Sequence, residues 1–319
     1  MSPERHPETH RVAVIGAGHV GSTYAYALMH TGAASEILLV DSDLRRAEGE
    51  AMDLSHGLPF VRPARIRALP LDAVEGADLI VLAAGAFTRP GETRLDLLGR
   101  NAGIIRDVVP ELIRRNPDAV LMVITNPVDV LTEAAVRYAG LPPGRVLGSG
   151  TVLDSARFRH ALALRCGVAA RNVHAYVVGE HGDSEVPVWS SAMLGGARLL
   201  DHWPPVGGPC PAEVRAEIDR EVREAAYRIV ERKGATYFGI GLSAATISRA
   251  ILRDEHALLT VSVPGEQGVS LSLPGVVGRG GVIRPSTLVL DEAESAALAR
   301  SRGLLREIVE RLELPRRSF

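Results

Sequence analysis

The sequence has few cysteines and no large excess of charge of either sign. Among its 319 residues only Cys166 and Cys210 are cysteines, and 36 basic residues nearly balance 38 acidic ones, for a net charge of −2. Two isolated cysteines form no metal-ligand spacing, and a secreted disulfide scaffold usually carries more of them. A nucleic-acid binder usually has a basic surplus. We therefore expect a cytoplasmic protein that binds neither a metal nor nucleic acid.

Long hydrophobic runs are also absent. The longest apolar runs, such as Leu79 to Ala84, fall far short of the roughly 20 residues that a membrane helix needs. The stretch from Met1 to Arg11 is polar, contains two prolines and lacks the apolar core of a signal peptide. The sequence therefore predicts no membrane partner, and its 46% hydrophobic content is typical of a globular protein.

Short aliphatic runs alternate with helix-like segments in the first half. We predict strands at 11–15, 36–40, 77–84 and 119–124, and helices at 21–30, 47–54 and 100–115. This alternation is typical of an α/β fold with a doubly wound parallel sheet and helices on both faces. Ligands bind such sheets at the carboxyl ends of the strands. Gly16, Asp41, Gly85 and Asn126 each follow a strand, so we expect them to converge on one crevice.

The second half has a different pattern. We predict helices at 155–164, 213–232 and 291–313, and strands at 173–178, 258–263 and 269–273, the last two as a hairpin. A boundary near Gly148 would divide the chain into two domains. Residues 1–148 would form the parallel-sheet domain, and residues 149–319 an α+β domain.

Three glycines follow the first predicted strand, in the order Gly16, Gly18 and Gly21. In this GxGxxG pattern the first glycine permits a tight turn, the second lets the backbone approach a pyrophosphate, and the third lets helix pack on strand. Alone, the pattern also fits an ordinary glycine-rich turn. Here, however, Asp41 ends the next strand, where a carboxylate bonds a ribose diol and repels a 2′-phosphate. The sequence therefore predicts a Rossmann domain that binds NAD rather than NADP.

His181 stands between two glycines in the run VGEHGDSEVP at 178–187. A histidine in such a turn is more often structural, but imidazole also exchanges protons near neutral pH. Asp154 and Arg157 would share one helix face, either as a surface ion pair or with separate tasks. In the second case Asp154 turns toward His181 and raises its pKa, while Arg157 grips a substrate carboxylate. The polar loop before Arg94 is either a mobile surface loop or a lid that delivers this arginine.

Seven stretches resemble the lactate dehydrogenases of the lactate/malate dehydrogenase family. They cover nearly the whole chain in the expected order: GAGHVG at 16–21, ILLVD at 37–41, PGETRLDLL at 90–98, TNPVDVL at 125–131, GSGTVLDSARFR at 148–159, GEHGDSEVPVWSSA at 179–192 and KGATYFGIG at 233–241. Malate dehydrogenases usually carry a different residue at the position of Glu180. The segment around His181 therefore favours the lactate-specific members.

The resemblance implies reversible hydride transfer between NADH and pyruvate, which gives L-lactate. His181 would donate the proton, Asp154 would orient it, Arg157 would hold the substrate carboxylate and Arg94 would polarise the carbonyl. The implied cofactor contacts are Gly16, Gly18, Val20, Gly21, Asp41, Gly85, Asn126, Ser149 and Ile240. The implied substrate contacts, besides the two arginines, are Thr88, Asn126 and Thr236.

One residue departs from the family pattern. Two positions before the loop proline, lactate dehydrogenases have Gln and malate dehydrogenases have Arg, whereas this chain has Thr88. A neutral threonine does not balance the second carboxylate of oxaloacetate, and it leaves room for side chains larger than a methyl group. Pyruvate is the expected substrate, and a malate dehydrogenase or a broader 2-hydroxy-acid dehydrogenase is the alternative. A non-catalytic NAD-binding protein is disfavoured, because it would not need all four reacting residues.

Arg159 and His174 match the positions that bind fructose 1,6-bisphosphate in allosteric bacterial members of the family. An arginine and a charged histidine from adjacent subunits would form a cationic pocket on a two-fold axis. The alternative is an exposed arginine and a histidine at a strand edge. The resemblance also implies a homo-oligomer, usually a tetramer.

Overall fold

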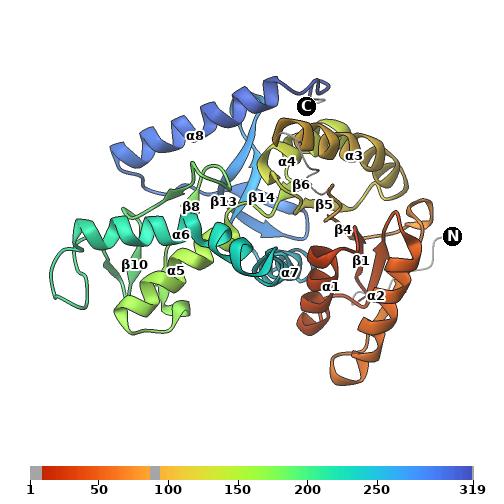
Figure 1. Ribbon diagram of the computed structural model, residues 1–319, viewed down its shortest axis with the longest axis horizontal. Coiled ribbons are helices and arrows are strands. Elements are labelled where there is room, and N and C mark those ends of the chain that lie inside the picture. Colours follow the sequence, from red (N-terminus) through yellow and green to blue (C-terminus); the bar gives the residue numbers. More distant parts are fainter. Residues whose placement is uncertain (1–8, 87–93, 318–319) are drawn as a thin grey trace.

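A computed structural model of the chain describes residues 9–86 and 94–317. Its central feature is a nine-stranded sheet (Figure 1). Six neighbouring strands run parallel, in the order β6 (Val146–Gly148), β5 (Val120–Val123), β4 (Leu79–Leu82), β1 (Arg11–Ile15), β2 (Glu36–Val40) and β3 (Arg65–Ala68). Beyond β6 the sheet continues in antiparallel fashion with β12 (Ala257–Pro264), β13 (Ser270–Gly278) and β14 (Gly281–Pro285).

Strand β1 shows why short aliphatic runs form the centre of this sheet. Val12 and Val14 pack into the core on one face, while Ala13 and Ile15 pack into the core on the other. All four are at most 4% exposed. Because both faces are covered, the strand is a continuous apolar run and does not alternate with polar residues.

Helices cover both faces of the sheet, as Figure 1 shows for α1 and α2 against α3 and α4. One face carries α1 (His19–Thr31), α2 (Leu44–His56) and α7 (Phe238–Leu252). The other carries α3 (Arg94–Arg115), α4 (Val128–Ala139) and α8 (Glu292–Glu310). The predicted fold class, a doubly wound parallel sheet followed by an α+β part, is confirmed.

The rest of the second half packs beside the sheet around α5 (Val152–Cys166) and α6 (Ala212–Lys233). It includes the short strands β7 (Val173–His174), β8 (Val177–Val178), β9 (Val186–Pro187), β10 (Met193–Leu194) and β11 (Ala197–Arg198). Phe158 and Trp189 lie in its core, with ring centroids 5.1 Å apart. On α6 the apolar stripe is buried at Ile218 and Val222, whereas Ile229 is 38% exposed.

Some elements differ from the sequence predictions. The strand predicted at 173–178 is divided into β7 and β8, because its two halves pair with different strands, β10 and β9. The sequence analysis did not predict helices α4 and α7, nor strands β3, β6, β9, β10, β11 and β14. Short 3₁₀ turns complete the fold, η1 (Leu58–Phe60), η2 (Leu71–Ala73), η3 (Ala170–Asn172) and η4 (Glu266–Gly268). Within the described ranges, no helix combines the length and apolar character that spanning a lipid bilayer requires.

Candidate active site

His181 lies on the loop between β8 and β9. The loop begins at Gly179, whose φ of +92° is in the left-handed region that favours glycine. A Cβ at Gly179 would lie 2.9 Å from the hydroxyl of Ser301 on α8, so a larger residue would push the loop away from this helix. Gly179 also exchanges two main-chain hydrogen bonds of 2.9 Å with Ser272 of β13. These contacts fix the start of the loop against the main sheet.

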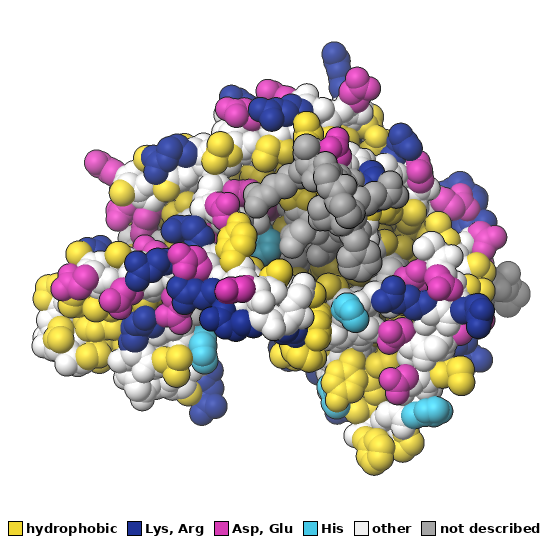
Figure 2. All heavy atoms as spheres, viewed as in Figure 1, with side chains coloured by type: hydrophobic (Ala, Val, Ile, Leu, Met, Phe, Trp, Pro, Cys, Tyr) yellow, Lys and Arg dark blue, Asp and Glu magenta, His cyan; other side chains and the backbone are white. Residues whose placement is uncertain are grey.

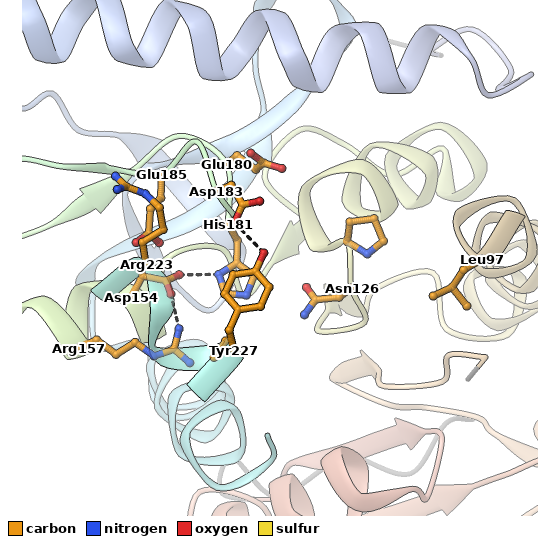
Figure 3. Close-up of a pocket in the computed structure, with 13 residues that line it drawn as sticks. Leu97, Asn126, Asp154, Arg157, Glu180, His181, Asp183, Glu185, Arg223 and Tyr227 are labelled. Carbon is orange, nitrogen blue, oxygen red and sulfur yellow. Dashed lines mark hydrogen bonds and ion pairs between the residues drawn. The ribbon is translucent and has the colours of Figure 1, made fainter. Parts of the chain in front are cut away.

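The ring of His181 pairs with Asp154, in the first turn of α5 (Figure 3). His181 Nδ1 lies 2.5 Å from Asp154 Oδ2, and Asp154 Oδ1 accepts a 2.6 Å hydrogen bond from the Arg157 guanidinium. Asp154 is only 1% exposed. One buried carboxylate therefore joins the imidazole to the guanidinium, and the structure brings together three of the four predicted catalytic residues.

The charges of this cluster stabilise one another. Burial disfavours the charged imidazole, but the charge and hydrogen bond of Asp154 overcome it and raise the pKa of His181 to about 9. Burial also opposes the Asp154 carboxylate, yet His181 and Arg157 hold the pKa of Asp154 below its usual value. At neutral pH the site therefore contains an imidazolium. Because Nδ1 is bonded to Asp154, Nε2 is the nitrogen that remains for a ligand.

A second buried carboxylate, Asp129, holds the main chain of His181. Asp129 lies in the first turn of α4, and its Oδ2 accepts a 2.7 Å hydrogen bond from the His181 N–H. Its Oδ1 accepts a 3.1 Å bond from the Ser272 hydroxyl. Burial raises the pKa of Asp129 to about 6, although these hydrogen bonds favour the carboxylate. The sequence analysis did not single out Asp129, which lies within the TNPVDVL stretch.

Two helices support the rest of the His181 loop. The hydroxyl of Ser301, fully buried on α8, accepts a 2.8 Å hydrogen bond from the Glu180 N–H and lies 2.9 Å from the Ser184 hydroxyl. From α6, the Tyr227 hydroxyl donates a 2.7 Å hydrogen bond to Asp183. These supporting residues were not predicted either, because nothing in their local sequence marks them.

A cavity of about 370 Å³ lies beside His181 and its partners Asp154 and Arg157. His181 and Arg157 lie on one side of it, and Asn126, from the loop after β5, lies toward the other (Figure 3). Glu185, directly before β9, and Arg223, on α6, also line the cavity. Neither was predicted as a site residue. On the face shown in Figure 2, acidic and basic side chains are interspersed over the surface.

The glycine-rich turn after β1 has the geometry that its sequence predicts. Gly16 has a φ of +103°, and a Cβ there would lie 2.5 Å from the Ala84 main-chain nitrogen. A Cβ at Gly21 would lie 1.8 Å from the Gly16 carbonyl oxygen, so this glycine is what lets α1 pack on the turn. Gly18 has no atom within 4 Å of a Cβ position. Its backbone is therefore open to a pyrophosphate at the N-terminus of α1.

Asp41, at the end of β2, faces the same turn. Its carboxylate accepts hydrogen bonds of 2.8 Å from the Ala17 N–H and 3.0 Å from the Asp43 N–H. Gly16, Asp41 and Gly85 line one cavity of about 590 Å³. An open backbone at the turn, a carboxylate at the second strand end and an adjoining cavity together fit a dinucleotide.

Asn126 does not join these three residues but lines the His181 cavity. Asn101 of α3 links the two regions. Its side chain donates a 3.1 Å hydrogen bond to the Asn126 carbonyl oxygen and accepts a 2.8 Å bond from the Ala86 N–H. The four residues predicted to share one crevice therefore line two separate cavities. The buried side-chain amide of Asn101 is hydrogen-bonded to the main chain near both.

Four other predicted contacts lie outside both cavities. Val20 on α1 and Ile240 on α7 pack against the core on one sheet face. Ser149 is buried directly after β6, and Thr236 is half-buried in the link between α6 and α7. None of these four described residues lines either cavity.

Two further predictions concern a lid and a regulatory site. Thr88 lies outside the described residues, as does the side chain of Arg94, the first residue of α3. Arg159 is half-buried on α5 and donates a 3.2 Å hydrogen bond to the Ser155 carbonyl oxygen, and burial lowers its pKa. His174 is exposed on β7.

The fold and the site together define an NAD-dependent dehydrogenase, in which a dinucleotide turn adjoins an acid–histidine–arginine cluster. Residues 10–148 match the family described as lactate/malate dehydrogenase, NAD binding domain. Residues 151–313 match the lactate/malate dehydrogenase, alpha/beta C-terminal domain. The chain belongs to the lactate/malate dehydrogenase family, as the resemblance predicted.

Individual relatives are similar along nearly the whole chain. The L-lactate dehydrogenase of Thermus aquaticus is 50% identical over 301 residues, which cover 93% of this chain and 97% of the relative. That of Deinococcus radiodurans is 49% identical over 306 residues, covering 95% and 100%. Among solved structures, the minor L-lactate dehydrogenase from Enterococcus mundtii, in a ligands-bound form, has a TM-score of 0.92 at 36% identity and covers 96% of this chain and 99% of its own.

Proposed function

We propose that this chain is an NAD-dependent L-lactate dehydrogenase that interconverts pyruvate and L-lactate. The observation that carries the proposal is the buried Asp154 carboxylate, which binds His181 Nδ1 at 2.5 Å and Arg157 at 2.6 Å. Relatives named L-lactate dehydrogenase that match over more than nine-tenths of the chain support it.

His181 acts as the acid in reduction of the keto acid. With a pKa of about 9 it is charged at neutral pH, and its Nε2 delivers a proton to the ketone oxygen as that oxygen becomes an alkoxide. Asp154 stabilises the imidazolium and fixes the ring. In the reverse direction, neutral His181 takes the proton from the hydroxyl group. Such acid–base catalysis contributes on the order of 10² to 10⁴ in rate.

Arg157 holds the substrate carboxylate. A guanidinium has five N–H donors, so Arg157 keeps its bond to Asp154 through Nη1 and offers others to the substrate. From the resemblance, we assign Arg94 to polarising the ketone and Asn126 to bonding near the reacting oxygen. Thr236 is assigned to the pocket wall from the family resemblance alone.

The turn after β1 and Asp41 hold the cofactor. When bound, NADH supplies the hydride that reduces the ketone carbon. Gly18 leaves room for the pyrophosphate, and Asp41 favours a free ribose 2′-hydroxyl over a 2′-phosphate. The assignment of these residues to an NAD-binding domain of residues 1–148, and of His181 to a catalytic domain of residues 149–319, is part of the proposal. From the resemblance, further cofactor contacts are Val20, Gly21, Gly85, Ser149 and Ile240.

Thr88 favours a second candidate, a 2-hydroxy-acid dehydrogenase with a broader substrate range, because threonine is smaller than the glutamine of the family pattern. The test is kcat/KM for NADH-dependent reduction of pyruvate, oxaloacetate and a 2-oxo acid with a bulkier side chain. We expect pyruvate to rank first. A bulkier substrate in first place would favour the second candidate, and oxaloacetate in first place would contradict both. Turnover of none would indicate a non-catalytic NAD-binding protein.

We further propose that the enzyme is a cytoplasmic tetramer in which Arg159 and His174 of adjacent subunits bind fructose 1,6-bisphosphate. The half-buried guanidinium and the exposed imidazole suit a phosphate ligand. Adding the sugar bisphosphate should lower the KM for pyruvate. No effect between about pH 5.5 and about pH 8, or a monomer in light scattering, would contradict this assignment.

A further inference from the structure

Glu185 is a buried carboxyl in the active-site cavity to which the mechanism above gives no role. It precedes β9 and is 5% exposed. Its Oε1 is enclosed and has no hydrogen-bond partner among the residues that the structure describes. A carboxylate that loses its water normally gains hydrogen bonds in exchange, because an unpaired buried charge costs several kcal/mol. This environment therefore suits a protonated carboxyl better than a charged one.

Charged groups from three elements act on Glu185. Asp154 and Arg157 of α5, Arg223 of α6 and His181 of the shared loop all line the same cavity (Figure 3). Burial and the negative charge of Asp154 raise the pKa of Glu185 to about 8, against the opposing effect of the three cations. At neutral pH most Glu185 side chains therefore carry a proton.

Arg223, like Glu185, has a buried polar atom without a hydrogen-bond partner among the described residues. Its Nε is enclosed and finds no hydrogen-bond partner within the described ranges. The other acids on the loop, Glu180 and Asp183, already accept hydrogen bonds from hydroxyl groups of the loop and of α6. While Glu185 is neutral, the positive charges of Arg223 and Arg157 therefore remain available to an anionic ligand.

We propose that Glu185 is a positioning residue whose protonation controls substrate binding: the keto acid binds while Glu185 carries its proton, and ionisation of Glu185 weakens that binding. The substrate enters as a carboxylate. A negative charge at Glu185 offsets part of the attraction that Arg157 and Arg223 exert on the substrate carboxylate. It also repels the incoming anion directly. The proton that reaches the ketone still comes from His181, so the effect falls on KM more than on kcat.

This inference rests on the proposed lactate dehydrogenase activity and adds a second titration to that of His181. A group with a pKa of about 8 is about nine-tenths ionised one pH unit higher. Glu185→Gln keeps the size of the side chain but cannot ionise. Between about pH 7 and about pH 9, the KM for pyruvate should therefore rise about tenfold more in the wild type than in this variant.

The experiment compares KM and kcat for pyruvate across this pH range in the wild type, Glu185→Gln and Glu217→Gln. Glu217 is an exposed acid on the same helix as Arg223, so Glu217→Gln should follow the wild type. Identical KM profiles for wild type and Glu185→Gln would overturn the role of Glu185 alone. Failure of the wild type to reduce pyruvate would overturn the proposed function instead, and with it this inference.

A second variant keeps the test open if Glu185→Gln does not fold. Arg223 lowers the pKa of Glu185, so Arg223→Gln should move the rise in KM to higher pH. The same variant should raise KM at neutral pH, because a cation that attracts the substrate is lost. A rise that begins at the same pH as in the wild type would count against the proposal.

Discussion

The carboxylate of Asp129 accepts a 2.7 Å hydrogen bond from the main-chain N–H of His181. Asp129 lies in the first turn of α4, so this bond attaches the loop to a helix that packs on the parallel sheet. Asp154, on α5, holds the imidazole ring of the same residue. Two buried carboxylates from different helices therefore fix the position and the charge of the imidazole.

Replacing Asp129 with Asn should lower the pKa of His181, because the negative charge of Asp129 helps to raise it. The pH above which the rate of pyruvate reduction falls should then be lower in this variant than in the wild type.

The same replacement should change how the stability of the fold depends on pH. The folded-state pKa of Asp129, about 6, lies above the value of about 3.9 for a free aspartate. The wild type should therefore lose unfolding free energy relative to the variant as pH rises through about 6. The measurement is the free energy of unfolding in urea at several pH values. The same pH dependence in both proteins would contradict this prediction.

The two directions of the reaction should depend on pH in opposite ways. Reduction needs charged His181, so kcat should stay level at neutral pH and fall above about 9. Oxidation of L-lactate needs the neutral ring, so kcat/KM should rise about tenfold per pH unit until about 9. The ion pair with Asp154 should stabilise the fold fully below about pH 6.5 and lose this effect as pH rises through about 9. A reduction rate that already falls near pH 6.5 would show an unshifted histidine.

Ser301→Ala should impair catalysis from a distance. It removes the acceptor for the Glu180 N–H, and an unsatisfied buried N–H costs about 1–3 kcal/mol. We expect kcat/KM for pyruvate to fall several-fold while the affinity for NADH, measured by fluorescence titration, changes little. Ser295→Ala, at an exposed position on the same helix, is the matched control. Equal kcat/KM in both variants would argue that α8 does not position the loop.

Asp41→Ser should change the cofactor preference. Removing the carboxylate takes away an acceptor for the ribose diol and the repulsion of a 2′-phosphate. The KM for NADH should rise and that for NADPH should fall, while pyruvate binding at saturating cofactor stays the same. The ratio of kcat/KM for the two cofactors is the measurement. An unchanged ratio would mean that Asp41 only holds the turn through the Ala17 N–H.

The fold could be predicted from sequence where local patterns and tertiary burial agree. Strands β1 and β2 have the residue bounds that their aliphatic runs suggested. Helix α4 was missed although Asp129, Thr132, Glu133 and Arg137 recur along it at helical spacing. The first three are buried, so its polar residues face the interior and not the solvent. Helix α7 is likewise mostly buried and begins with a glycine-rich stretch, which lowers its helix propensity.

The reacting residues were predictable because each has a distinctive local context. His181 lies between glycines, and Asp154 stands one helical turn before Arg157. Their supporting residues approach only in the folded chain. Asp129 is 52 residues from His181 in sequence, and Ser301 is 121 residues from Glu180. No local pattern encodes such contacts, so they required the structure.

The most direct test of the account is kcat for NADH-dependent pyruvate reduction in His181→Asn, with NADH affinity measured on the same protein. Asparagine fills a similar space but cannot carry the proton that His181 donates. We expect kcat to fall by at least about 10²-fold while NADH still binds. An undiminished kcat in this variant would contradict the assignment of His181 as the acid.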